Sequence, residues 1–168
     1  MKLSRWSAGL TAVVSATLLA SAQVPASATT FTAELVARNS QRCVTVDGAV
    51  TTNNGRVVQW DCVDVPNQKW KLVATSAGYY TVRAEHSSKC LTVDGADTGN
   101  GGRVVQWDCL VDVPNQEWRL VQKDSGYFSI EARHSGKCLT VQGVSTQNGA
   151  ALVQWECNEG HNQHFRLG

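Results

Sequence analysis

The feature that most restricts how this chain can fold is a motif that occurs three times, at offsets of 47 and 48 residues. Each copy has a cysteine in a hydrophobic segment, then Gln-Trp-acid-Cys, and it ends on Asn-Gln-x-Trp or Asn-Gln-x-Phe. The segments span residues 42–48, 57–62 and 67–70, then 89–95, 104–109 and 115–118, then 137–143, 152–157 and 162–165. Propellers have similar periods, but they use about four or more blades. We therefore predict a closed threefold arrangement in one domain, in which each copy adds two strands to a barrel and one hairpin to its cap.

The six cysteines form one pair in every copy, and the members of each pair are 19 residues apart. An even number of cysteines in an exported chain indicates disulfides, whereas in the cytosol it would indicate metal or redox chemistry. Six cysteines allow many pairings, but the repeat favours the one that recurs in each copy. The predicted disulfides are Cys43–Cys62, Cys90–Cys109 and Cys138–Cys157.

Along the chain the local pattern is one of short strands separated by turns. Residues 43–46, 57–61, 70–73 and 79–83 are β-branched, aromatic or alternating, which is typical of strands. No segment keeps the apolar period of a helix long enough to form one. The prediction is an all-β domain with four strands in each of three repeats, at about 31–74, 75–122 and 123–168.

The first 28 residues have the features of a secretory signal peptide. The chain opens with two basic residues, residues 8–22 are mostly small or apolar, and Ala26-Ser27-Ala28 offers a cleavage site. The apolar stretch is too short for a membrane span. We therefore expect a secreted protein whose single mature domain spans 29–168, without membrane insertion.

Charge and symmetry exclude several functional classes. The chain has 15 basic and 14 acidic residues, and two of the basic ones precede residue 29. The mature domain therefore has a net charge of −1. Nucleic acids and anionic membranes bind clustered positive charge, so neither is an expected partner. Catalysis requires one asymmetric site with distinct acid and base groups, which three near-identical copies do not offer. We expect no enzyme, no cofactor and no metal.

The cysteine spacing and the closing Gln-x-Trp resemble the ricin B-type (R-type) lectin family, whose fold is the β-trefoil. The resemblance extends from about Phe31 to Gly168, and it is specific because three short motifs occur in register three times. The small chain is also similar to the free-standing haemagglutinins of actinomycetes, some of which recognise galactose or L-rhamnose. The resemblance implies a carbohydrate-binding protein with up to three shallow sites.

The resemblance also implies which residues bind sugar. In this family each copy uses an aromatic residue two positions before the second cysteine and an Asn just before Gln-x-Trp. These positions hold Trp60, Trp107 and Trp155, and Asn67, Asn115 and Asn162. The family's acidic residue, two positions after the first cysteine, is replaced by Thr45, Thr92 and Thr140.

Another residue must therefore supply the carboxylate that orients a hexose through two hydroxyl bonds. We favour Asp47 and Asp94, two positions further along, with Gln142 as their altered counterpart in the third copy. The alternative is a set of loop acids near the Asn of each copy. These acids are Asp64, Asp112 and Glu159.

The chemistry of these side chains suits a pyranose. An exposed Trp ring is a flat partner for its C–H face, while Asp and Asn bond to its hydroxyls. Such a shallow site predicts about millimolar affinity, raised by avidity when glycans are clustered. Alternatively, the three Trp residues before the second cysteines pack over the disulfides. Trp70, Trp118 and Phe165 align with an interior aromatic position, so we expect them in the core.

Two other functions stay open at this point. The domain could be a module that binds a polysaccharide such as xylan or arabinan. It could also be a trefoil that binds or inhibits a protein, for which the loops at Pro66 and Pro114 are the candidates. The sequence does not determine the oligomeric state, and we favour a monomer.

Overall fold

The computed structural model describes residues 29–75, 78–124 and 126–168. In these residues it contains twelve β-strands in three groups of four, joined by short 3-10 helices. The strands are β1 (Thr30–Ala37), β2 (Cys43–Val46), β3 (Gly55–Trp60), β4 (Lys69–Ala74), β5 (Tyr80–Ala84), β6 (Cys90–Val93), β7 (Val104–Trp107), β8 (Glu117–Gln122), β9 (Tyr127–Ala132), β10 (Cys138–Val141), β11 (Leu152–Trp155) and β12 (His164–Leu167). The 3-10 helices are η1 (Asp47–Ala49), η2 (Pro66–Gln68), η4 (Asp94–Ala96), η5 (Pro114–Gln116), η6 (Gln142–Val144) and η7 (His161–Gln163). The all-β prediction is confirmed, and the predicted signal peptide lies outside the described residues.

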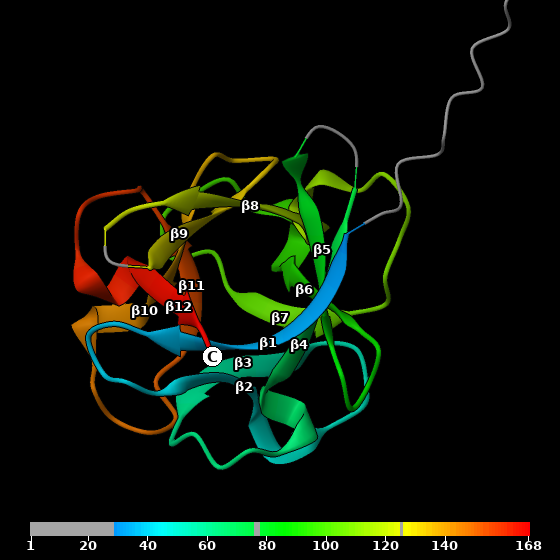
Figure 1. Cartoon of the computed structure of the whole chain (residues 1–168). Coiled ribbons are helices and arrows are strands. Elements are labelled where there is room, and N and C mark those ends of the chain that lie inside the picture. Colours follow the sequence, from blue (N-terminus) through cyan, green and yellow to red (C-terminus); the bar gives the residue numbers. More distant parts are fainter. Residues whose placement is uncertain (1–28, 76–77, 125) are drawn as a thin grey trace, which may run out of the picture.

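Six strands close into a barrel (Figure 1). β1 pairs with β4 and β12, β5 pairs with β4 and β8, and β9 pairs with β8 and β12, always antiparallel. Each copy contributes two barrel strands, and the last strand of one copy pairs with the first strand of the next. Closure pairs the backbone groups that an open sheet would leave at its edges.

The other six strands form the hairpins β2–β3, β6–β7 and β10–β11. The hairpins meet around a common axis, where Arg56 on β3 pairs with Val105 on β7 and single bridges join Val58 to Ala151 and Arg103 to Val153. A six-stranded barrel with three such hairpins is the β-trefoil that the sequence predicts.

The core is built from equivalent residues of the three copies. Trp70, Trp118 and Phe165 occupy the same position in β4, β8 and β12, and each is at most 1% exposed. The indole N–H groups of the two tryptophans donate hydrogen bonds of 2.9 Å to the carbonyl oxygens of Val44 and Leu91. Burial of each ring stabilises the fold by about 2–3 kcal/mol, and the paired N–H groups avoid a desolvation cost. The prediction that these three residues lie in the core is confirmed.

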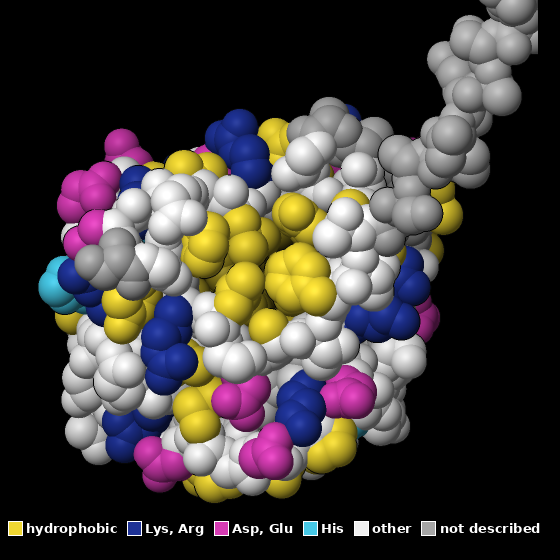
Figure 2. Space-filling view, viewed as in Figure 1, with side chains coloured by type: hydrophobic (Ala, Val, Ile, Leu, Met, Phe, Trp, Pro, Cys, Tyr) yellow, Lys and Arg dark blue, Asp and Glu magenta, His cyan; other side chains and the backbone are white. Residues whose placement is uncertain are grey.

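Hydrophobic side chains also gather in a hollow at one end of the barrel (Figure 2). Among the partly buried residues on the core are Leu120 and the edge-to-face pair Phe31 and Tyr80, whose ring centroids are 6.1 Å apart.

No helix in the described ranges is long and apolar enough to cross a membrane.

The three predicted disulfides are present. Each links the first residue of a hairpin's first strand to a residue just beyond its second strand. The pairs are Cys43–Cys62, Cys90–Cys109 and Cys138–Cys157.

Candidate functional site

Each copy holds a shallow pocket beside the Trp that ends its second hairpin strand. The pocket volumes are about 350, 340 and 440 Å³ in the first, second and third copy. Shared lining positions hold Thr45, Asp47, Gly48, Trp60, Asn67 and Gln68; Thr92, Asp94, Gly95, Trp107, Asn115 and Gln116; and Thr140, Gln142, Gly143, Trp155, Asn162 and Gln163. The structure thus brings the aromatic residue, the Asn and the favoured acid or Gln of each copy into one pocket.

A left-handed turn places the acid at the pocket. β2 ends at Val46, and the chain then folds into η1, in which Gly48 has φ +61°. The equivalent glycines, Gly95 and Gly143, have φ +61° and +65°. Glycine adopts this conformation without the strain that a Cβ would cause. The turn keeps Asp47 beside the hairpin strand on which Trp60 lies.

The pocket tryptophans are large aromatic residues that stay exposed. Trp60, Trp107 and Trp155 are 43%, 38% and 42% exposed. The exposed surface leaves room for a ligand to stack on each ring.

The pocket Asn is anchored by the backbone of its own copy. The side-chain N–H of Asn67 donates to the carbonyl oxygen of Val46 at 2.9 Å. Asn115 and Asn162 donate to the carbonyl oxygens of Val93 and Val141 at 2.8 and 3.0 Å. Among the described residues no donor bonds to the Oδ1 of Asn67, so a fixed acceptor remains for a ligand hydroxyl.

The Thr at the position of the family's acid forms part of the pocket floor. Thr45 is 5% exposed, donates to the carbonyl oxygen of Cys43 at 2.8 Å and accepts from Nε2 of Gln68 at 3.1 Å. Gln68 also bonds to the backbone of Asp61 and Val63, both at 2.8 Å. The same bonds recur in the other copies. Gln68 therefore ties down the turn.

An arginine pairs with the pocket acid in two copies. Asp47 lies 3.6 Å from Arg56, and Asp94 lies 2.6 Å from Arg103. The third copy has Ala151 at the arginine position, opposite Gln142. The sequence motifs predicted no role for these arginines, although the repeat aligns Arg56 and Arg103 with Ala151.

The alternative loop acids lie outside the three Trp pockets. Asp64 forms an ion pair of 2.8 Å with Lys69, whose ammonium lowers the pKa of the Asp64 carboxyl, and it lines a separate cavity. Glu159 pairs with Lys123 at 3.3 Å. Asp112 lines none of the three pockets. The geometry favours Asp47 and Asp94 over these acids.

The third pocket differs from the other two in its walls. Gly160 stands where the first copy has Val65, and Asn158 replaces the hydrophobic residue at Val63. His161 lines the pocket at the position of Pro66. The absence of the valine side chain widens this pocket, and its lining residues include no carboxylate.

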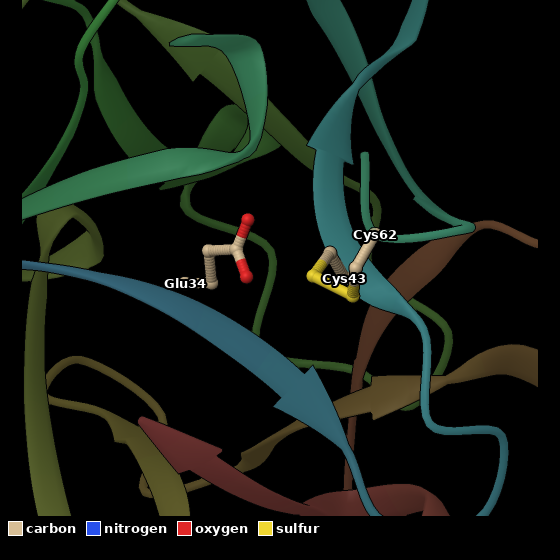
Figure 3. A group of neighbouring side chains, drawn as sticks. All are labelled: Glu34, Cys43 and Cys62. Carbon is tan, nitrogen blue, oxygen red and sulfur yellow. A yellow bond between two sulfur atoms is a disulfide. The ribbon is translucent and has the colours of Figure 1, made fainter. Parts of the chain in front are cut away.

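Two clusters combine a carboxylate with cysteine sulfurs. Glu34 lies near Cys43 and Cys62 (Figure 3), and the second cluster is Glu131 with Cys138 and Cys157. The ligand atoms of each cluster lie within 4.8 Å of one another. Both cysteine pairs are oxidised, however, and metals bind the thiolate rather than a disulfide sulfur. Neither cluster is a metal site.

Comparisons with known proteins agree with this geometry. The designed threefold-symmetric protein ThreeFoil is 40% identical, with a TM-score of 0.79 over 81% of this chain and 96% of its own. The exo-β-1,3-galactanase 1,3Gal43A of Clostridium thermocellum is 30% identical, with a TM-score of 0.78 over 86% of this chain but only 31% of the enzyme. A ricin B-like lectin of Macrolepiota procera, solved with lactose, shares the fold at 18% identity and a TM-score of 0.71, over 82% of this chain and 94% of its own.

A search of curated proteins found no match. The model of the ricin-type β-trefoil lectin domain, by contrast, matches residues 31–165. This match covers all three copies and their pockets. The chain therefore belongs to the ricin-type β-trefoil lectin family.

Proposed function

We propose that this protein is a secreted, non-catalytic lectin that binds galactose- or L-rhamnose-type sugars through up to three shallow pockets. The observation that carries the proposal is the threefold recurrence of one arrangement: an exposed Trp ring, a backbone-anchored Asn and a polar side chain after the first hairpin strand. The lining residues combine a flat apolar surface with fixed hydrogen-bonding groups, which is what a pyranose requires.

In the first pocket the sugar stacks its C–H face on Trp60. The Asp47 carboxylate accepts bonds from ring hydroxyls, and the Arg56 guanidinium lies 3.6 Å from it. The Oδ1 of Asn67 accepts a further hydroxyl bond. Trp107, Asp94 and Asn115 do the same in the second pocket. Each contact area is small, so affinity per site is about millimolar and avidity supplies the rest.

Galactose-type specificity is supported by related structures that carry such sugars. The Macrolepiota procera lectin was solved with lactose, and an earthworm R-type lectin half was solved with GalNAc. Secretion is supported by the three disulfides, which persist in oxidising compartments. The near-equivalence of the pockets favours binding over catalysis, which requires distinct acid and base groups.

A glycan array tests the proposal, followed by titration of the best ligand against pocket variants. We expect Trp60→Ala and Trp107→Ala each to remove one binding site and leave the melting temperature nearly unchanged, because both rings are exposed. Val111→Ala removes another exposed hydrophobic side chain, 87% exposed and outside the pockets, and should bind like the wild type.

The alternatives give different results. Binding mainly to xylan or arabinan chains would redefine the protein as a polysaccharide-binding module. A large loss of stability in Trp60→Ala, with unaltered binding per folded molecule, would show that the ring is a packing residue. A folded, multivalent sample that binds no glycan would overturn the proposal and direct attention to protein partners at the Pro66 and Pro114 loops.

A further inference from the structure

A cavity of about 280 Å³ lies on the axis where the three hairpins meet, apart from the Trp pockets of the first two copies. Arg56 and Arg103 line it with aliphatic and small residues and with Gln142, and its described lining contains no acid. The repeat would place a third arginine here, but the third copy has Ala151. The short alanine side chain leaves space beside two guanidinium groups.

This axial cavity adjoins the pocket of the third copy. Gln142 and Val153 line both the axial cavity and the third pocket. The pockets of the first and second copies share no lining residue with the axial cavity. A ligand on Trp155 can therefore extend past Gln142 toward the axis, whereas ligands in the other two pockets are blocked on that side.

The barrier in the first two copies consists of the acid–arginine ion pairs. Asp47 with Arg56, and Asp94 with Arg103, stand between their pockets and the axis. In the third copy Gln142 and Ala151 replace both members of the pair at once. The two replacements remove the barrier and also remove the carboxylate that would repel an anionic ligand.

We propose that the third pocket and the axial cavity form one extended site for an acidic oligosaccharide. A neutral sugar unit stacks on Trp155, and an anionic group on the next unit binds Arg56 and Arg103. The inference rests on the proposed sugar-binding function of the Trp pockets.

Arginine suits this role because its planar guanidinium binds carboxylate and sulfate oxygens with two parallel hydrogen bonds. The Arg56 side chain is 60% exposed, and its ion pair with Asp47 is long, at 3.6 Å. Arg56 can therefore turn to a ligand at little cost. Arg103 is held more firmly, by Asp94 at 2.6 Å and by Oδ1 of Asn54 at 3.0 Å. A uronic acid carboxylate and a sulfate ester offer the same chemistry to this pair.

The test uses the variant Trp60→Ala/Trp107→Ala, in which Trp155 is the one exposed tryptophan left among the described residues. Its fluorescence is titrated with a neutral galactosyl-galactose disaccharide, with the same disaccharide sulfated on its second unit, and with glucuronosyl-galactose. We expect one or both acidic probes to bind about tenfold more tightly than the neutral one. The probe that gains more identifies the preferred anion, and the gain should shrink in high salt.

Two further variants in the same background locate the anion. Arg56→Gln should remove most of the gain and keep neutral binding, while Arg166→Gln, an exposed arginine outside the pockets, should change neither. Gln142→Asp/Ala151→Arg rebuilds the ion pair of the other copies and should abolish the gain. Equal affinity for neutral and acidic probes, or a gain that survives Arg56→Gln, would overturn the extended site. Failure of the wild type to bind any sugar would instead overturn the proposed function itself.

Discussion

Trp60 of the first copy lies against Gly149 of the third copy, with ring atom Cζ3 3.8 Å from the position that a Gly149 Cβ would occupy. Trp155 has the same relationship with Gly101 of the second copy, also at 3.8 Å. A neighbouring copy therefore supports the edge of each of these rings. An isolated copy would lack this neighbour beside its tryptophan.

The support for Trp60 can be tested at Gly149. This residue has φ +80°, so Gly149→Val costs about 1–2 kcal/mol of stability from backbone strain. We also expect weaker binding in the first pocket, because valine adds γ carbons beyond a Cβ position that is already in van der Waals contact with the ring. Gly126→Val is the matched control, since Gly126 has φ +82° and nothing within 4 Å of its Cβ position. Thermal melts and sugar titration check both, and equal binding in the two variants would contradict the support.

A buried glutamine holds the loop of the preceding copy in place. Nε2 of Gln106 donates to the carbonyl oxygens of Val50 and Thr52 at 2.7 and 2.9 Å, and its Oε1 accepts from Ser87 at 2.7 Å. We expect Gln106→Ala to lower the free energy of unfolding by about 2–3 kcal/mol, because it leaves these groups unpaired. Gln122→Ala, at an exposed site on β8, should stay within about 0.5 kcal/mol of the wild type in urea unfolding.

The disulfides should contribute equally in the three copies. Each closes a loop between cysteines 19 residues apart, so the chain-entropy model assigns each about 3 kcal/mol. Cys43→Ala/Cys62→Ala and Cys138→Ala/Cys157→Ala should therefore lose similar stability by denaturant unfolding. Strong reductant breaks all three disulfides. It should therefore lower the melting temperature of the wild type by more than the removal of one disulfide does in either variant. A melting temperature that reductant leaves unchanged would contradict a stabilising role.

Acid should destabilise the third copy through His164. Burial lowers the pKa of this imidazole below its ordinary value of 6.5, Lys123, Arg38 and His161 act in the same direction, and Glu159 opposes them. The unfolded chain then binds the proton more readily, so stability is lost as pH falls below about 6.5. We expect the melting temperature to fall between about pH 7.5 and 5. His164→Gln should flatten that part of the profile, and a parallel profile in the variant would assign the change to other groups.

Local sequence pattern was sufficient for much of the fold. Cys43 opens β2 and Trp60 ends β3, where the alternation of β-branched and polar residues indicates strands. Trp70 and Trp118 are buried, as their place in the closing motif predicts. The threefold repeat then predicted how the strands assemble, because three equal units of this size close around an axis.

The site could be predicted only as far as single copies determine it. Asp47, Trp60 and Asn67 belong to one copy, and they line one pocket; their sugar-binding roles stay predictions. The pairing of Arg56 with Asp47 and the cavity on the axis depend on how three hairpins are placed, which no local periodicity encodes. The width of the third pocket depends on the absence of a side chain at Gly160. A motif of residue types does not predict the space that such an absence leaves.

The seam between β1 and β12 joins the two ends of the described chain. Leu35 pairs with Leu167, and Glu34 and Gly168 exchange backbone hydrogen bonds of 3.0 and 2.9 Å. The ring of strands therefore has no inherent first member. A circular permutant that starts at the second copy and ends with the first, its old termini joined by a short linker, would keep the same strand pairings. The same architecture is therefore compatible with more than one order of the copies along the polypeptide.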